Sequence, residues 1–89
     1  MIIKLTKEQK DFLDNRVLIA HKDVLRKIEK NSSVHFNKFK LIIDIDLANK
    51  LSELCEELLI KNGFDENFEP NETGKMAESI IDIISQSFF

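Results

Sequence analysis

The apolar residues between positions 47 and 59 repeat with the period of an α-helix. They recur at three- and four-residue intervals on one stripe and comprise Leu47, Ala48, Leu51, Leu54, Cys55, Leu58 and Leu59. This spacing predicts an amphipathic helix that buries one face. Asp44 or Asp46 can cap its start, because a carboxylate accepts hydrogen bonds from the free N–H groups there. We expect the helix to end at Gly63 in the left-handed conformation, with Phe64 folded back on Leu59.

A second C-terminal helix is expected after the polar loop of residues 64–70. Asn71 is the expected N-cap, and Glu72 places an acid at the positive end of the helix dipole. The apolar side of this helix consists of Ala77, Ile80, Ile81, Ile84 and Phe88. Because the connection is short, the two helices are predicted to pack antiparallel.

The middle of the chain has the alternation of β-strands. Every second residue from Phe39 to Ile45 is apolar, which predicts a strand and, with the residues before it, a hairpin over about residues 33–44. A two-stranded hairpin is marginal in water, so it must either pack on helices or find a third strand, for which residues 1–5 are the candidate within this chain.

The hairpin turn is predicted at Asn37-Lys38. The apolar residues before the turn, Val34 and Phe36, stand at even positions, and those after it, Phe39 and Leu41, at odd positions. One straight strand would therefore put the two pairs on different faces. A turn at these two residues brings all four to one face, with Phe36 opposite Phe39 and Val34 opposite Leu41.

The N-terminal third has helical spacing with an interruption. Thr6 and Gln9 have the spacing of a capping box, which starts a helix. Apolar residues continue at mostly helical intervals to Ile28, and Asp14-Asn15 is a candidate break. Together these elements predict a small α+β fold, mostly helical, in which residues 1–89 form a single domain.

Length and composition limit the class of protein. With 89 residues, 43% hydrophobic and 33% charged, the chain is typical of a globular protein with one modest core. No apolar run approaches the roughly 18 residues of a membrane span, and residues 1–5 are too short for a signal-peptide core. A single cysteine cannot form an internal disulfide, so a cytoplasmic location is expected.

Charge is divided between the two halves of the chain. Residues 1–43 carry ten Lys/Arg against five acids, and residues 44–89 carry eleven acids against three lysines. The acidic half would repel nucleic acid and attract a basic protein. The acids expected to contact such a partner lie on the helix and in the loop that follows, at Glu53, Glu56, Glu57, Asp65, Glu66 and Glu69.

Residues that could support catalysis or metal binding have simpler interpretations. Asp44 and Asp46 are paired carboxylates at a strand-to-helix junction, but helix capping accounts for them. His21 and His35 fall in different elements and Cys55 lies in an apolar stripe, so the sequence has no closely spaced zinc-ligand pair. We therefore expect no catalytic residues, no metal, no cofactor and no enzyme activity.

The loop shares part of its spacing with a calcium-binding EF-hand loop. Asp65, Asn67, Glu69 and Asn71 alternate like the first four ligands. The match then fails, because proline stands at position 70 where glycine is needed, and methionine at position 76 where a bidentate glutamate is needed. The sequence favours a solvated acidic loop whose last residue caps a helix.

Two other binding modes stay open. A basic stripe leads into the hairpin and could contact phosphates, although acids interrupt it and the net charge is −3; it comprises Lys22, Arg26, Lys27, Lys30, Lys38 and Lys40. The hairpin edge could instead pair with a second copy as a structural subunit. The terminal Phe88-Phe89 are either a lid on the core or an anchor in an interface.

From residue 39 onward the chain resembles a group of small uncharacterised bacterial proteins. The shared features are a strand, a helix, the loop Gly63-Phe64-Asp65-Glu66-Asn67-Phe68, and Asn71-Glu72-Thr73-Gly74-Lys75 opening a final helix with Ile80-Ile81-Asp82. In that group the loop commonly reads Gly-Phe-Asp-Glu-Asn-Tyr, so Phe68 replaces a tyrosine here. The resemblance covers about half of the chain and implies a loop anchored by Phe64 and Phe68.

The group in turn resembles accessory proteins found beside toxin genes, and the resemblance implies no catalytic residues. Charge and resemblance together predict a protein-binding module, of the immunity or antitoxin type, that occludes a basic toxin such as a nuclease. The alternatives are a small nucleic-acid-binding regulator that uses the basic half and a structural subunit.

Overall fold

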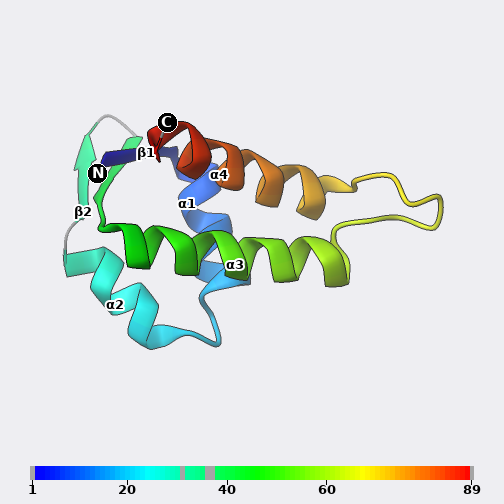
Figure 1. Cartoon of the computed structure of the whole chain (residues 1–89), viewed down its shortest axis with the longest axis horizontal. Coiled ribbons are helices and arrows are strands. Elements are labelled where there is room, and N and C mark those ends of the chain that lie inside the picture. The colour runs from blue at the N-terminus through cyan, green and yellow to red at the C-terminus, as the bar shows by residue number, and fades with distance from the viewer. Residues whose placement is uncertain (1, 31, 36–37, 89) are drawn as a thin grey trace.

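Three short strands form an antiparallel sheet in the order β1-β3-β2. In the computed structural model, which describes residues 2–30, 32–35 and 38–88, β1 is Ile2–Thr6, β2 is Ser32–His35 and β3 is Lys38–Ile42. The candidate third strand near the N-terminus does form, and it lies beside β3 (Figure 1). Because successive side chains alternate between faces, one face buries Ile3, Leu5 and Leu41.

The hairpin forms, but its register differs by two residues from the expected one. Val34 lies opposite Phe39, and Leu41 lies opposite Ser32. The strand β3 already includes Lys38, which the sequence analysis placed in the turn. A shift of two residues preserves the alternation, so Leu41 stays on the buried face of the sheet. The expected pairing of residue 36 and the turn at residue 37 lie outside the described residues.

The N-terminal helix does not break at residues 14–15 as expected. It begins as α1 (Lys7–Phe12) with the predicted capping box, in which Thr6 and Gln9 exchange two hydrogen bonds of 3.0 and 3.2 Å. It then widens into a π-helical turn, η1 (Leu13–Val17), which ends where Leu18 N–H donates to the Leu13 carbonyl at 2.8 Å. A turn leads from there to α2 (Lys22–Lys30).

The long helix α3 (Ile45–Asn62) starts immediately after the sheet. Asp44 is its N-cap, because the Asp44 carboxylate accepts a hydrogen bond from Leu47 N–H at 2.8 Å. Ile45, expected on the strand, lies in the first turn of the helix and is 59% exposed. The strand therefore ends at Ile42, three residues before the end of the apolar alternation, because the cap starts the helix.

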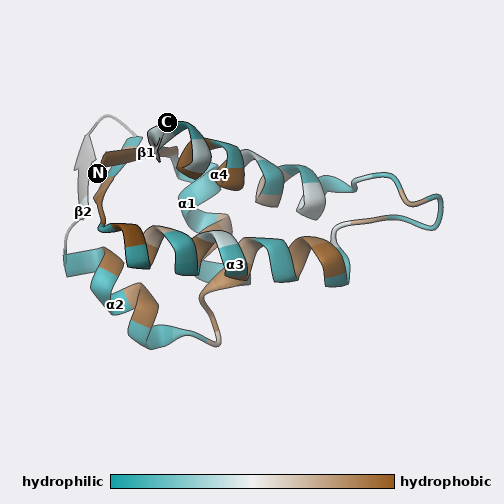
Figure 2. Cartoon of the chain, in the orientation of Figure 1, coloured by the Kyte–Doolittle hydropathy of each residue, from teal (hydrophilic) through white to brown (hydrophobic). Residues whose placement is uncertain are grey.

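The final helix α4 (Glu72–Phe88) packs antiparallel against α3. In Figure 1 the two helices lie side by side, and the loop between them projects beyond their ends. Both ribbons carry polar and apolar positions in turn (Figure 2), as amphipathic helices do. The two alternatives for Phe88-Phe89, a lid on the core or an interface anchor, fall on side chains outside the described part of the chain.

The hydrophobic core draws on the sheet, η1, α2, α3 and α4, and Phe12 of α1 packs against it partly buried. Its buried members are Ile3, Leu5, Leu13, Val17, Leu18, Val24, Ile28, Leu41, Ile43, Ala48, Leu51, Leu54, Cys55, Ile80 and Ile84. The apolar stripe of α3 is thus confirmed as a core face. No helix in the described part of the chain is both long and apolar enough to cross a membrane.

Gly63 ends α3, but it is not left-handed. Its φ and ψ are −90° and −5°, in the right-handed region, so the expected Schellman ending is wrong. Glycine is needed at position 63 because Leu59 of the same helix lies close by, and at position 74 because its backbone approaches that of Gly63. A Cβ on Gly74 would overlap the carbonyl oxygen of Gly63, and a Cβ on Gly63 would lie 2.7 Å from Leu59 Cδ1. Phe64 is 43% exposed and pairs through its backbone with Pro70.

Candidate protein-binding surface

Three of the predicted partner-binding acids form a strip on the outer side of α3. Glu53, Glu56 and Glu57 are all exposed and are spaced three and four residues apart, so they are neighbours on the surface opposite the buried stripe. We call them the acidic strip. Ile60 continues the same side one turn further on and is 76% exposed. The strip therefore leads toward the loop between α3 and α4.

The other three predicted acids lie in that loop, which we define as residues 63–71. Asp65, Glu66 and Glu69 are exposed. One oxygen of Asp65, Oδ1, accepts hydrogen bonds from the N–H groups of Asn67 at 2.8 Å and Glu69 at 3.1 Å. Asp65 thus also organises the loop, whereas Glu66 and Glu69 extend the negative charge of the strip beyond the helix end.

Asn71 holds the two ends of the loop together. Its side-chain Oδ1 accepts from Gly74 N–H at 2.9 Å, which confirms the predicted N-cap of α4. Its Nδ2 donates to the Asn62 carbonyl at 2.8 Å, and its backbone N–H donates to the Gly63 carbonyl at 2.9 Å. The base of the loop is therefore fixed to both helices.

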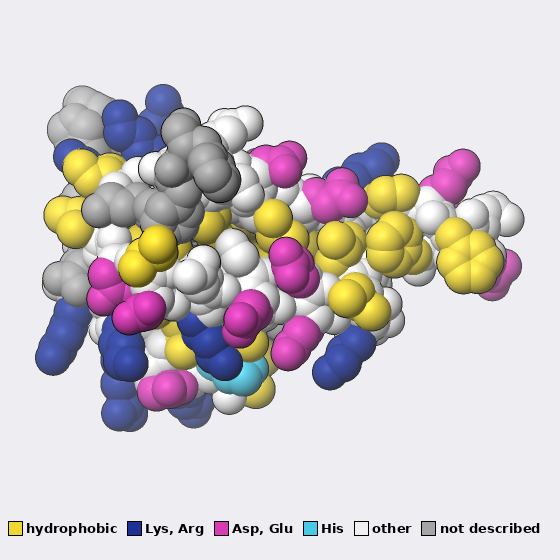
Figure 3. Space-filling view, viewed as in Figure 1, with side chains coloured by type: hydrophobic (Ala, Val, Ile, Leu, Met, Phe, Trp, Pro, Cys, Tyr) yellow, Lys and Arg dark blue, Asp and Glu magenta, His cyan; other side chains and the backbone are white. Residues whose placement is uncertain are grey.

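The loop does not anchor itself through its phenylalanines, as the resemblance implied. Phe68 is 87% exposed and Phe64 is 43% exposed. Figure 3 shows hydrophobic side chains gathered on this face over the loop end of the helix pair. The sequence analysis missed these apolar residues as contact candidates. The available signal was an aromatic residue inside a polar run with no helical or strand periodicity.

The basic residues lie mainly at the other end of the molecule (Figure 3). Lys38 and Lys40 are exposed on β3, and Lys4 of β1 lies directly opposite Lys40 on the outer face of the sheet. The predicted residues of α2 are exposed as well, at Lys22, Arg26, Lys27 and Lys30. The structure thus adds Lys4 to the predicted basic stripe.

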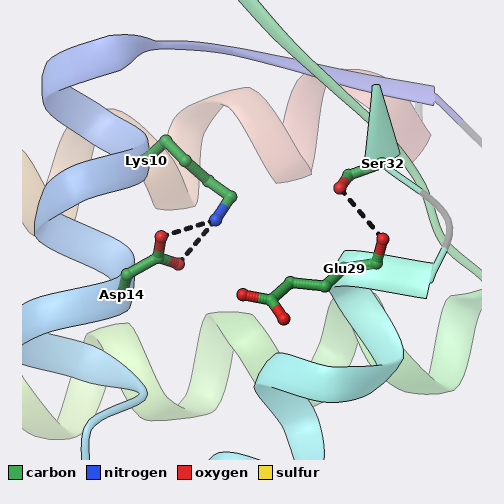
Figure 4. Close-up of polar contacts among 4 residues, drawn as sticks. All are labelled: Lys10, Asp14, Glu29 and Ser32. Carbon is green, nitrogen blue, oxygen red and sulfur yellow. Dashed lines mark hydrogen bonds and ion pairs between the residues drawn. The ribbon is translucent and has the colours of Figure 1, made fainter. Parts of the chain in front are cut away.

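Lys10 is a charged side chain in the interior, a position that no pattern in the sequence predicts. It is 5% exposed, and its Nζ donates to both carboxylate oxygens of Asp14 at 2.6 Å. The same Nζ lies 5.7 Å from the centre of the Phe39 ring, within range of a cation–π interaction. In Figure 4 the Glu29 side chain points toward this pair from the facing helix. We regard the pair as structural because a carboxylate and an aromatic ring already satisfy the ammonium.

The side chains considered above for catalysis or metal binding do not form a catalytic or metal site among the described residues. Burial, and to a lesser degree the neighbouring Glu56 charge, raises the pKa of the Cys55 thiol to about 12, so Cys55 is a poor nucleophile. The Asp44 carboxylate is occupied as the N-cap of α3. Asp44 and the exposed Asp46 both border a groove of about 460 Å³ between α2 and α3, which Lys27 and Lys50 also line. In the residues the structure describes, no three His, Cys, Asp or Glu side chains converge on a metal position.

No protein-family model, curated protein or solved structure gives a significant match to this chain. A functional interpretation therefore depends on the charge and exposure of the surfaces described above.

Proposed function

We propose that this chain binds and masks a basic protein, in the manner of an immunity or antitoxin-type protein. The observation that carries the proposal is the continuity of the acidic strip with the loop acids. Glu53, Glu56 and Glu57 lead along α3 to Glu66 and Glu69, and all five side chains are exposed. A surface of this kind is complementary to the Lys/Arg-lined site of a toxin such as a nuclease.

Occlusion needs no catalytic group on this chain. Carboxylates on the rim would attract the basic partner and speed its encounter, and the bound chain would then block access to the partner's site. Exposed charges are screened beyond about 8 Å at physiological ionic strength, so association should slow as salt is added. The lysines concentrated at the far end of the molecule would favour one orientation of approach.

The test uses the purified products of the two genes that flank this one as probes. Association rates are measured by surface plasmon resonance at several salt concentrations for the wild type and for a triple reversal, Glu53→Lys, Glu56→Lys and Glu57→Lys. We expect the reversal to slow association at least tenfold at low salt and to flatten the salt dependence. An unchanged rate would exclude the acidic strip as the binding surface.

A matched control reverses the charge of three exposed residues of α2, with Lys22→Glu, Arg26→Glu and Lys30→Glu. This variant carries the same number of changed charges on a surface helix. It should not slow association with a basic partner. Circular dichroism must show that both triple variants keep the helical content of the wild type.

One observation favours nucleic-acid binding as a second candidate function. Lys4 and Lys40 are direct neighbours across the outer face of the sheet. Like charges at such positions are unfavourable unless an anion lies between them. Against this candidate, the acidic end would oppose the approach of a polyanion, so gel-shift titration with mixed DNA and RNA at low salt should show no binding below roughly 10 μM. Sub-micromolar binding lost in Lys4→Glu/Lys40→Glu would reverse this ranking.

A further inference from the structure

Phe68 combines two unfavourable features at one position of the loop. Its side chain is 87% exposed, and its backbone has a φ of 61°. Among the described residues it is the one non-glycine residue with a positive φ. A bulky side chain is strained in this conformation, and a glycine would adopt it freely. Neither feature stabilises the folded chain.

The loop that presents Phe68 is nevertheless held by its own hydrogen bonds. Phe68 N–H donates to the Asp65 carbonyl at 3.1 Å, and Asp65 N–H donates to the Glu69 carbonyl at 2.9 Å. The Asp65 carboxylate adds the two bonds described above, and Asn71 closes the base. The loop thus projects from the helix pair as a pre-ordered element (Figure 1), and little entropy would be lost on binding through it.

We infer that Phe68 is the anchor of the protein-binding surface and enters an apolar pocket of the basic partner. The inference rests on the proposed function and adds the chemistry of the contact. Exposed aromatic side chains that fill a pocket on the partner commonly dominate binding energy. A projecting loop fits a concave site, as an occluding protein needs to do when it blocks a cleft.

The charges around Phe68 define the rim of that pocket. Asp65, Glu66 and Glu69 lie within three residues of it, and all are exposed. The complementary site is therefore an apolar cleft bordered by Lys or Arg side chains on a protein. Two copies of this chain meeting loop to loop would bring these acids together, so charge opposes that arrangement.

The test measures affinity for whichever flanking-gene product binds the wild type, using isothermal titration calorimetry. We expect Phe68→Ala to raise the dissociation constant by about 30-fold or more, as for an interface hot spot. Phe68→Tyr keeps the aromatic ring and should bind within about threefold of the wild type, well below a hot-spot loss. Ile19→Ala is the matched control, because Ile19 is also exposed, at 64%, but lies in the turn before α2.

A measurement without the partner addresses the strain. Phe68→Gly should raise the melting temperature by about 4 °C while weakening binding as much as Phe68→Ala does. A lowered melting temperature would mean that Phe68 stabilises the fold, and would overturn its assignment as an anchor.

The outcomes separate the anchor from the function. If Phe68→Ala binds like the wild type while the acidic-strip reversal does not, the proposed function stands and the anchor is wrong. If neither product binds the wild type, the proposed function fails and the anchor fails with it. Analytical ultracentrifugation tests for self-association. If the wild type self-associates with rising concentration and Phe68→Ala does not, Phe68 contacts a second copy of this chain, and the inferred cleft on a basic partner is wrong.

Discussion

The side-chain amide of Asn71 donates a hydrogen bond across 2.8 Å to the main-chain carbonyl of Asn62, the last residue of α3. Asn71 also caps α4 through its other side-chain atom, which accepts from Gly74 N–H. One residue thus satisfies an unpaired carbonyl at the end of one helix and an unpaired N–H at the start of the next. The geometry of the helix pair depends on both bonds.

Asn71→Ala should lower the free energy of unfolding by about 2 kcal/mol, because it removes both side-chain bonds. Asn71→Asp keeps an acceptor for Gly74 N–H but cannot donate to the Asn62 carbonyl. Its loss should be about 1 kcal/mol. Urea denaturation followed by circular dichroism measures both. Equal losses in the two variants would show that the bond to Asn62 contributes nothing to stability.

Gly74→Ala should destabilise the protein although it lies in a helix. In a free helix the change would be favourable by about 1 kcal/mol. Here the added Cβ would overlap the Gly63 carbonyl oxygen and lie 3.0 Å from the Gly63 carbonyl carbon. The backbone at Gly63 cannot yield easily, so we expect a net loss of about 2 kcal/mol, as for an overpacked site.

Ser85→Ala is the control for Gly74→Ala, because Ser85 is exposed on the same helix. It should be neutral or slightly stabilising, since alanine has the higher helix propensity. A gain in stability for Gly74→Ala, comparable with that of the control, would show that α3 and α4 can separate at no cost.

Most of the fold follows from local patterns in the sequence. The stripe of α3, the Thr6–Gln9 capping box, the Asn71 cap and the third strand were all predictable, because each depends on residues close together in the chain or on one simple need for pairing. The conformation of Gly63 was not. Nor was the need for glycine at position 74, which comes from contact with the backbone of Gly63, a contact that no local pattern records.

The candidate surface was only half predictable. Charge density indicates the acids of residues 53–69, because charged side chains stay in water. The same reasoning fails for Phe68 and Lys10, since hydrophobicity predicts the reverse of what the structure has for each. Phe68 is exposed by the loop conformation, and Lys10 is buried through its pairing with Asp14.

Removing Asp14 from the Lys10–Asp14 pair should lower the free energy of unfolding more than removing Lys10 does. Asp14→Ala leaves the Lys10 ammonium buried without its carboxylate, and we expect a loss of about 3 kcal/mol, the low end for a broken buried pair. Lys10→Met keeps an apolar chain against Phe39 and leaves Asp14, whose side chain is 29% exposed, within reach of water. Its loss should be about 1 kcal/mol, the typical effect of a point substitution.

A double variant completes this cycle. Lys10→Met/Asp14→Ala removes both charges and should be more stable than Asp14→Ala alone, because it leaves no ammonium buried without its carboxylate. Thermal denaturation of the four proteins gives the coupling energy. A coupling energy near zero would mean that the two residues act independently.

The buried Cys55 thiol should make stability fall in alkaline solution. Burial, followed by the Glu56 charge, raises its pKa from 9.0 to about 12 in the folded chain. Between these values the unfolded chain loses the thiol proton and the folded chain keeps it, so the unfolded state gains stability as the pH rises. The free energy of unfolding should therefore be unaffected by this group below pH 9. Above that, it should decrease by up to about 1.4 kcal/mol for each pH unit.

Cys55→Ala isolates this contribution, because every other ionisable side chain is common to both proteins. The variant should be less stable near neutral pH by about 1 kcal/mol, since it removes a buried sulfur. Its stability should then fall less steeply between pH 9 and 10.5 than that of the wild type. In the same range native Cys55 should resist iodoacetamide and react only on unfolding, because the thiolate is the nucleophile. Parallel pH profiles, or rapid alkylation of the native protein, would mean that the thiol is accessible to water and that its pKa is close to the ordinary value.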